Sequence, residues 1–241
     1  MTYINFHAIF NFPLLFLLAV LSFWVAPWLA GEWIALAVVL AVVMVFTTPW
    51  DNAAAKWGIW GFPRDRVLAW LGYLPIEEYA FFLLQSLNVV LLTRWLLWQF
   101  DWRTQTVSGW EEMNLPVAGA IAVLWAVLWL VVVLRRPPAR FHYAIHLLLW
   151  FLPVVALLAA VAPGVVAAHA GLLALVTLVA GTYYTLADVV AVREGTWFFD
   201  EKQITGYKLG GILPWEEAAF FYLTSLLVAQ SYLLLLPPEA R

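Results

Sequence analysis

The sequence predicts an all-α integral membrane protein with seven transmembrane helices. Of its 241 residues, 65% are hydrophobic and 11% are charged, whereas about a quarter are charged in an average soluble domain. A helix needs roughly 20 apolar residues to cross the hydrocarbon core of a bilayer. Seven stretches meet that requirement, at about residues 6–29, 33–50, 75–98, 116–134, 141–162, 165–187 and 214–236.

An internal repeat divides the chain into two similar units. The segment 74–82 (LPIEEYAFF) returns as 213–221 (LPWEEAAFF), with an offset of 139 residues. Asp51 recurs as Asp188 and Trp60 as Trp197, with an offset of 137 residues. The loop of the second unit is therefore two residues longer, and loops tolerate such changes.

The repeat defines the domain organisation. We expect residues 1–98 to form the first three-helix unit, 99–140 a connector that contains the fourth helix, and 141–241 the second three-helix unit. A single connecting helix gives both units the same orientation in the membrane, which is a parallel-repeat plan. The predicted architecture is thus two parallel three-helix repeats plus a connecting helix (3+1+3), with the functional cavity at the seam between the repeats.

The elements of the two units correspond in order. The first apolar run follows no basic region and is long enough to span, so we expect a helix of the protein rather than a signal peptide. The second helix of each unit ends just before an aspartate, Asp51 or Asp188. The third helix begins at Pro75 or Pro214, because a proline suits the first helical position.

The basic residues predict the orientation in the membrane. With seven spans, nine of the twelve lysines and arginines fall on the side of the N-terminus, and positive charge marks the cytoplasmic side. We therefore expect a cell-membrane protein whose N-terminus and carboxylate-bearing loops are cytoplasmic and whose C-terminus lies outside. The nine residues are Lys56, Arg64, Arg66, Arg135, Arg136, Arg140, Arg193, Lys202 and Lys208.

Two glutamates follow each proline in the first turn of a helix. They are Glu77 and Glu78 in the first unit and Glu216 and Glu217 in the second. One interpretation is that these carboxylates only cap the helix and face water, because the helix dipole favours negative charge there. A polar residue seven positions after each second glutamate, Gln85 or Thr224, shares its helix face, which favours a functional cluster over a simple cap.

Six carboxyl groups are expected to converge at one depth, because Asp51 and Asp188 stand on the same side of the membrane. Ionisable groups inside a membrane are functional by default, and carboxyl groups in different surroundings can act as proton donor and proton acceptor. Spacing does not decide which of two adjacent glutamates is the acid. The candidate catalytic residues are Glu78, Glu217, Glu77, Glu216, Asp51 and Asp188.

Aromatic residues crowd the same loops and first turns. One interpretation is an aromatic belt at the membrane surface. As a set they can also shield a carbocation from water and stabilise it through cation–π contacts. The candidate substrate-binding residues are Phe81, Phe82, Phe220, Phe221, Trp60 and Trp197.

Several other chemistries fit poorly. Four histidines and no cysteine give few ligands for a metal cluster, and the helical pair His142 and His146 has no carboxylate in its helix. The closely spaced aspartates that bind a diphosphate through magnesium are absent. The lysines lie in loops, away from any retinal Schiff base. There is no phosphate-binding glycine loop and no basic surface for nucleic acid. We expect no cofactor and no metal.

These motifs resemble those of the lycopene cyclases of the heterodimeric or fused type, with both half-domains in one chain. The resemblance covers residues 1–236. It rests on Pro75-Ile76-Glu77-Glu78, Pro214-Trp215-Glu216-Glu217, Asp51-Asn52, Gly58-Ile59-Trp60-Gly61, Asp188 and Gly195-Thr196-Trp197. Val189 stands where the first unit has Asn52, and Trp215 where it has Ile76, so the two halves are not chemically identical.

The resemblance implies cyclisation of the linear ends of lycopene to β-ionone rings without net redox change. A carboxylic acid protonates the terminal double bond, an internal alkene captures the cation, and a carboxylate removes a ring proton. It also implies a lipophilic carotenoid taken from the bilayer, contact with lipid, and other carotenoid-pathway enzymes as partners. Alternatives are a cyclase acting on a C50 carotenoid, a small-solute transporter with the same 3+1+3 plan, and a non-catalytic membrane partner. A transporter would require polar residues near mid-depth, and we expect few there.

Overall fold

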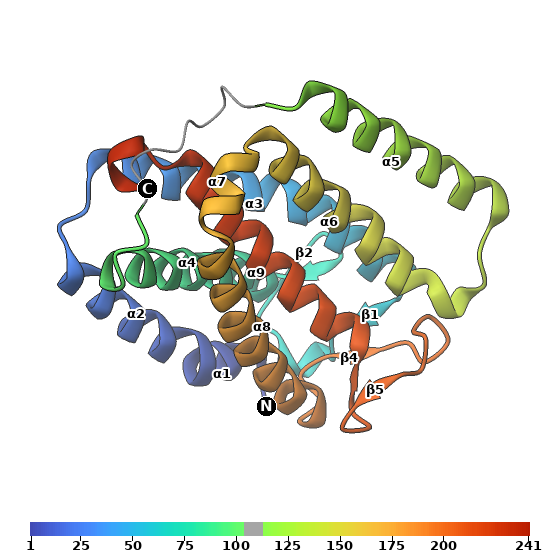
Figure 1. Cartoon of the computed structure of the whole chain (residues 1–241). Coiled ribbons are helices and arrows are strands. Elements are labelled where there is room, and N and C mark those ends of the chain that lie inside the picture. Colours follow the sequence, from blue (N-terminus) through green and yellow to red (C-terminus); the bar gives the residue numbers. More distant parts are fainter. Residues whose placement is uncertain (104–112) are drawn as a thin grey trace.

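The computed structural model describes residues 1–103 and 113–241 and contains seven helices long and apolar enough to cross a membrane. The predicted all-α membrane fold is confirmed. The connector predicted at 99–140 includes residues 104–112, which lie outside the described residues. Figure 1 shows the seven long helices as one bundle, with short strands gathered at one end.

The first unit contains three spans. The first consists of α1 (Tyr3–Phe6), a π-helical turn (His7–Asn11) and α2 (Phe12–Val25), and the others are α3 (Ala30–Trp57) and α4 (Ile76–Gln99). The connector helix is α5 (Leu115–Arg135). It packs against α6 at the edge of the bundle, and no residue of its span is buried.

The second unit repeats this plan. A short 3-10 turn (Ala139–Phe141) leads into α6 (His142–Val161), and α7 (Pro163–Ala168) precedes α8 (Ala170–Arg193) and α9 (Trp215–Leu235). The third helices of the two units, α4 and α9, pack against each other and are the most buried of the seven spans. The seam between the units therefore runs through the centre of the bundle.

Some helix ends differ from the prediction. The second helix continues to Trp57, where Gly58 takes a left-handed conformation with φ of 71° and ends it. Asp51 and Asp188 thus lie inside α3 and α8 rather than after them. The prediction ended the helices at the first charge, although the alanine-rich residues that follow favour helix. Pro75 and Pro214 precede the first helical residue instead of occupying it.

Short strands join the loops of the two units. β1 (Trp60–Gly61) pairs with β4 (Phe198–Phe199), so that Trp60 lies opposite Phe199. Two equivalent hairpins lead into the third helices, namely β2 (Trp70–Leu71) with β3 (Leu74–Pro75) and β5 (Lys208–Leu209) with β6 (Leu213–Pro214). This loop layer covers one end of the seam.

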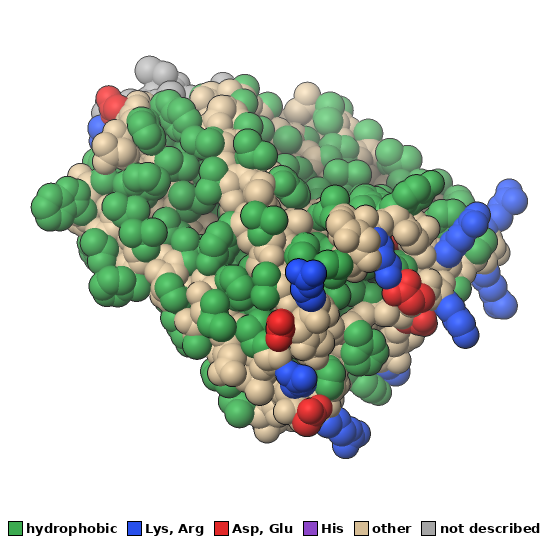
Figure 2. Space-filling view, turned by 90° about the horizontal axis from the view of Figure 1, so that it is seen from below, with side chains coloured by type: hydrophobic (Ala, Val, Ile, Leu, Met, Phe, Trp, Pro, Cys, Tyr) green, Lys and Arg blue, Asp and Glu red, His purple; other side chains and the backbone are tan. Residues whose placement is uncertain are grey.

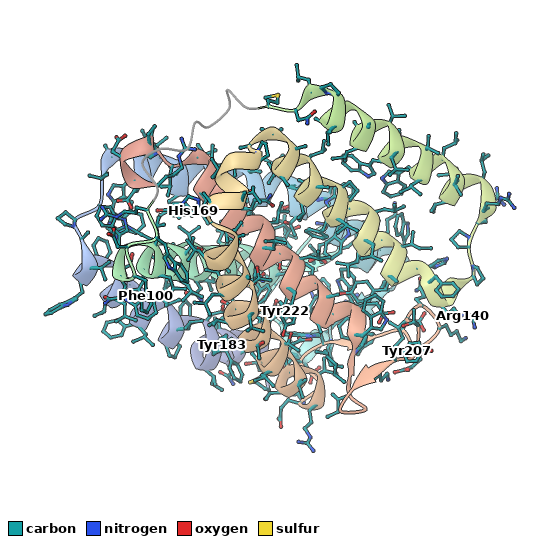
Figure 3. The ribbon with its side chains drawn as sticks, in the orientation of Figure 1. Phe100, Arg140, His169, Tyr183, Tyr207 and Tyr222 are labelled. Atoms are coloured by element: carbon teal, nitrogen blue, oxygen red, sulfur yellow. The ribbon has the colours of Figure 1, made fainter. Side chains whose placement is uncertain are left out.

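The surface is polarised along the bundle. Figure 2 shows hydrophobic side chains over most of the visible face and lysine and arginine side chains gathered towards one end. In Figure 3, Arg140 and Tyr207 lie at the end that carries the loops, and Phe100 and His169 lie towards the other end. This distribution fits a membrane-spanning bundle; which end is cytoplasmic stays a prediction.

The interior also differs between the two ends. At the end opposite the loops, the core is mainly leucine and valine. Near the loops it is mainly aromatic. Close helix packing is visible in the second unit, where the Tyr222 ring of α9 lies over Gly181 of α8 and a Cβ atom there would meet the ring at 2.7 Å.

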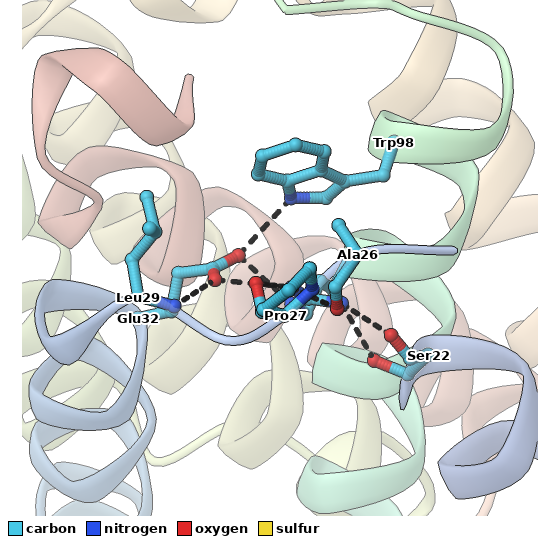
Figure 4. Close-up of polar contacts among 7 residues, drawn as sticks. Ser22, Ala26, Pro27, Leu29, Glu32 and Trp98 are labelled. Carbon is cyan, nitrogen blue, oxygen red and sulfur yellow. Dashed lines mark hydrogen bonds and ion pairs between the residues drawn. The ribbon is translucent and has the colours of Figure 1, made fainter. Parts of the chain in front are cut away.

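An ion pair lies inside the end opposite the loops. The Glu32 carboxylate accepts hydrogen bonds from Arg94 Nε at 2.8 Å and from the Trp98 indole at 3.1 Å (Figure 4). Arg94 also donates to backbone oxygens in the turn between α2 and α3, including that of Pro27 at 3.0 Å. Both side chains are fully buried. Through these hydrogen bonds, the ion pair holds the turn between α2 and α3 against α4.

Candidate active site

A small chamber lies beneath the loop layer, at the seam between the units. Its volume is about 40 Å³, which leaves room for only a few water molecules. Three carboxyl groups line it, those of Asp51, Glu78 and Glu217, and no lysine, arginine or histidine is among its described lining residues. The other lining residues are Tyr3, Trp50, Trp60, Phe62, Phe81, Tyr143, Trp197, Phe199, Phe220 and Phe221.

Glu78 and Glu217 occupy equivalent positions on α4 and α9, and each is held by a tyrosine from the first helix of its own unit. The Tyr3 hydroxyl donates to Glu78 Oε2 at 2.6 Å, and the Tyr143 hydroxyl donates to Glu217 Oε2. Each pair leaves the other glutamate oxygen without a hydrogen bond to the tyrosine. The chamber therefore contains two matched glutamate–tyrosine pairs.

The tryptophans of the loops pack across the seam. The Trp197 ring lies 5.0 Å from the Tyr3 ring of the other unit, and the Trp60 ring lies 5.1 Å from the Tyr143 ring. Each tyrosine ring therefore packs against the loop tryptophan of the opposite unit. Neither half can form the chamber alone.

The two aspartates differ in their surroundings. Asp51 Oδ1 accepts a hydrogen bond of 2.9 Å from the Trp60 indole and lies in the chamber. Asp188 is fully buried, and neither of its carboxyl oxygens has a hydrogen-bond partner among the described residues, although the Trp197 indole is nearby. It is not one of the chamber's lining residues. Asp51 and Asp188 therefore correspond in the repeat but differ in position, because only Asp51 lines the chamber.

The first glutamate of each pair binds the loop rather than the chamber. Glu77 Oε1 accepts a hydrogen bond of 2.7 Å from the backbone N–H of Leu68. Glu216 Oε1 accepts one of 2.8 Å from the backbone N–H of Thr205. Neither glutamate lines the chamber. Adjacent helical residues point about 100° apart, which is why one glutamate of each pair faces the loop and the other the chamber.

Five of the six predicted aromatic residues line the chamber, and Phe82 does not. The Phe220 ring stacks on Trp50, with centroids 5.4 Å apart and planes within 6°. The Phe81 and Phe221 rings meet edge to face at 6.2 Å. These rings form walls of the chamber around its carboxyl groups.

Below the chamber, the two deeper polar residues meet directly. Gln85 Nε2 donates a hydrogen bond of 3.0 Å to Thr224 Oγ1, and Thr224 Oγ1 in turn donates to the backbone oxygen of Phe220 at 2.8 Å. Both are buried. The hydrogen bond between the two side chains joins α4 to α9.

The histidines do not gather in the chamber. His7 Nε2 lies 3.0 Å from the backbone oxygen of Glu77, and His146 Nε2 lies 2.9 Å from that of Trp50. His142 bonds to Gln203 on the loop side. Among the described residues, no group of three or more His, Cys, Asp or Glu side chains is arranged to hold a metal ion.

Tyr3 and Tyr143 are residues of the chamber that are not among the predicted site residues. Tyr3 and Tyr143 stand near the start of the first helix of each unit, 140 residues apart, almost the offset of the glutamates. This repeated spacing is the sequence signal that could identify the two tyrosines. In the structure the two tyrosines occupy equivalent places, each bound to the chamber glutamate of its own unit.

Curated relatives cover most of the chain. It is 32% identical over 243 residues to a bifunctional lycopene cyclase/phytoene synthase of Sporisorium reilianum, covering 96% of this chain and 34% of that protein. It is 31% identical over 202 residues to a lycopene beta-cyclase of Halobacterium salinarum, covering 82% of this chain and 80% of that protein. A bifunctional lycopene cyclase/phytoene synthase of Blakeslea trispora is 28% identical over 229 residues, 92% of this chain.

The chain spans about a third of the length of the bifunctional relatives. No family model matches the sequence, and no solved structure matches it.

Proposed function

The chain belongs to the lycopene cyclase family, and we propose that it is a lycopene beta-cyclase that closes the linear ends of lycopene into β-ionone rings. The observation that carries this proposal is the chamber at the seam. It brings Glu78, Glu217 and Asp51 together among aromatic rings, with no cationic side chain among its described lining residues. Proton transfer to and from a hydrocarbon requires a proton donor, a proton acceptor and surroundings that exclude water.

The reaction balances without an oxidant or reductant. A carboxylic acid of the chamber gives its proton to the terminal double bond of the polyene, and a tertiary carbocation forms. An internal double bond attacks that cation and closes the ring, and the charge moves to a ring carbon. A carboxylate then removes a ring proton and a new double bond forms. One proton enters and one leaves for each ring.

Glu78 and Glu217 are the proposed acid and base. Three carboxyl groups close together in surroundings of low polarity, with no positive partner, do not all ionise, so proton donor and acceptor can coexist. Each tyrosine hydrogen bond orients one glutamate. Asp51, held by Trp60, lies in the same chamber and can exchange protons with either.

Glu77, Glu216 and Asp188 have proposed supporting roles. The hydrogen bonds of Glu77 and Glu216 to loop amides position the loops above the chamber. Asp188, the third of these candidates for catalysis, is fully buried and does not line the chamber, so its proposed role is to act on the chamber carboxyl groups without contact with a substrate.

The aromatic walls have two proposed effects. They exclude water, which would quench the carbocation, and their faces stabilise positive charge. The chamber is narrow and lined by aromatic rings, so the substrate end enters as the surrounding rings move apart. The substrate itself is a carotenoid dissolved in the bilayer.

Expression of the chain in a lycopene-producing bacterium tests the activity. Conversion of lycopene to cyclic carotenoids supports the proposal. Unchanged lycopene beside a well-inserted protein contradicts it and favours the transporter or the non-catalytic partner. A C50 carotenoid supplied in parallel tests the alternative substrate.

The proposed location is the cell membrane, with the loops cytoplasmic and the C-terminus outside. The chain has no cysteine, so single cysteines report sidedness without background. In intact cells, a membrane-impermeant maleimide should label Glu239→Cys and leave Lys202→Cys unlabelled. The reverse pattern would invert the orientation.

A further inference from the structure

An apolar groove runs along the outside of the bundle between α3 and α6. Its volume is about 240 Å³, and its floor is formed by α4 and α9. Nearly all of its lining is hydrocarbon, and the polar pair on its floor, Gln85 and Thr224, is joined by a hydrogen bond. At its rim, Val38 and Val42 are exposed. The groove therefore opens on the surface that faces lipid.

The groove ends at the catalytic chamber. Phe220 lines both spaces. On one side its ring stacks on Trp50 of the chamber, and on the other it meets Phe151 of the groove at 5.7 Å. Phe220 lies one helical turn after Glu217 and shares its face. Movement of this one ring would connect the lipid-facing groove with the carboxyl groups.

The equivalent position on the other side of the seam is closed. Thr47 and Leu227, which line the groove, correspond in the repeat to Tyr184 and Asn88. Asn88 Nδ2 donates to the Tyr184 hydroxyl at 2.8 Å, and that hydroxyl donates to Asn11 Oδ1 at 3.2 Å. All three side chains of this polar plug are buried. Asn88 lies near the middle of α4, so polar groups fill this side of the seam within the span.

We infer that the groove between α3 and α6 is the lipid-side entrance to the chamber and holds the polyene of the carotenoid while one of its ends reacts. This inference rests on the proposed function. An elongated hydrocarbon is the occupant that fits, because the groove follows α9 from Phe220 to Leu235, about 22 Å at 1.5 Å per residue. Since one end enters at a time, the two rings close in successive binding events.

Narrowing the groove tests this inference. Val42→Trp places an indole at the groove rim, and Val45→Trp is the matched control, because Val45 is also exposed on α3 but does not line the groove. Ser231→Phe narrows the groove from α9. Initial rates of lycopene cyclisation are measured with purified protein in liposomes, and the thermal unfolding of each variant is measured beside them.

We expect Val42→Trp and Ser231→Phe to lower kcat/KM for lycopene by about tenfold, mainly through KM, because access rather than chemistry is impaired. Val45→Trp should match the wild type. Wild-type rates in both groove variants, with normal folding, would overturn the inference and leave the proposed function intact, and would indicate that lipid chains alone fill the groove. An equal loss in Val45→Trp would also overturn it. Absence of cyclic product from the wild-type protein would instead contradict the proposed function.

Discussion

Gln85 on α4 donates a hydrogen bond of 3.0 Å to Thr224 on α9, although these two residues occupy the same position in the two repeats. The contact places the repeat interface directly below the carboxyl groups. Seven residues earlier on each helix stand Glu78 and Glu217. The two halves thus present their matching glutamates to one shared chamber.

Loss of either chamber glutamate should stop catalysis without unfolding the protein. Glu78→Gln and Glu217→Gln keep the size and hydrogen-bonding capacity of the side chain but remove the transferable proton. We expect cyclisation to fall by about 10²–10⁴-fold in each variant, the range typical of a lost general acid or base. Pigment analysis in a lycopene-producing host measures it. Glu201→Gln, at an exposed loop position, is the matched control and should stay active.

The loop-binding glutamates should respond differently. Glu77→Gln and Glu216→Gln retain an oxygen that can accept the loop N–H, so activity should survive. Glu77→Ala and Glu216→Ala remove the carboxylate that accepts the partly buried loop N–H, and a hydrogen bond to a charged group contributes about 1.5–3 kcal/mol. Thermal unfolding and activity, measured together, check this. Inactive but fully stable glutamine variants would show that Glu77 and Glu216 take part in the chemistry.

The tyrosine hydroxyls orient the chamber glutamates, so their removal should slow the reaction. Hydrogen bonds to charged groups contribute about 1.5–3 kcal/mol, so Tyr3→Phe and Tyr143→Phe should lower kcat by roughly tenfold to a hundredfold. KM should change little, because the ring remains. Steady-state rates in liposomes test this. Unchanged kcat in both variants would remove the tyrosines from the account. Tyr207→Phe, at an exposed loop position, serves as control.

The buried ion pair at the other end should contribute to stability and not to chemistry. Arg94→Met leaves the buried Glu32 charge unpaired, and breaking such a pair costs about 3–5 kcal/mol. Arg103→Met removes the exposed pair with Asp101 and should cost at most about 1 kcal/mol. Thermal unfolding in detergent compares the two. Equal stability of both variants would contradict the assigned role of Arg94.

Much of the fold follows from local patterns in the sequence. Apolar length predicts the seven spans, and the duplicated segment with Glu77 and Glu78 predicts which helices meet at the seam. The predicted end of α3 before Asp51 is too early, because a charged residue can lie inside a helix when it faces a chamber. The left-handed Gly58 marks the true end.

The finer division of the site depends on contacts between distant residues. Glu77 and Glu78 are neighbours in sequence, and only their partners, Leu68 and Tyr3, separate loop binding from the chamber. Likewise, Asn88 and Tyr184 close one side of the seam although neither shows a motif. Such contacts arise from packing between helices 96 residues apart, which no local pattern encodes.

Cyclisation in D₂O tests the central claim most directly. If an exchangeable carboxyl group of the chamber starts the reaction, β-carotene formed from lycopene over many turnovers should carry one deuterium for each ring closed, as measured by mass spectrometry. The glutamine variants of Glu78 and Glu217 should form labelled rings about 10²–10⁴-fold more slowly. Cyclic product without deuterium, or normal labelling in both variants, would contradict the proposal that these acids transfer the proton.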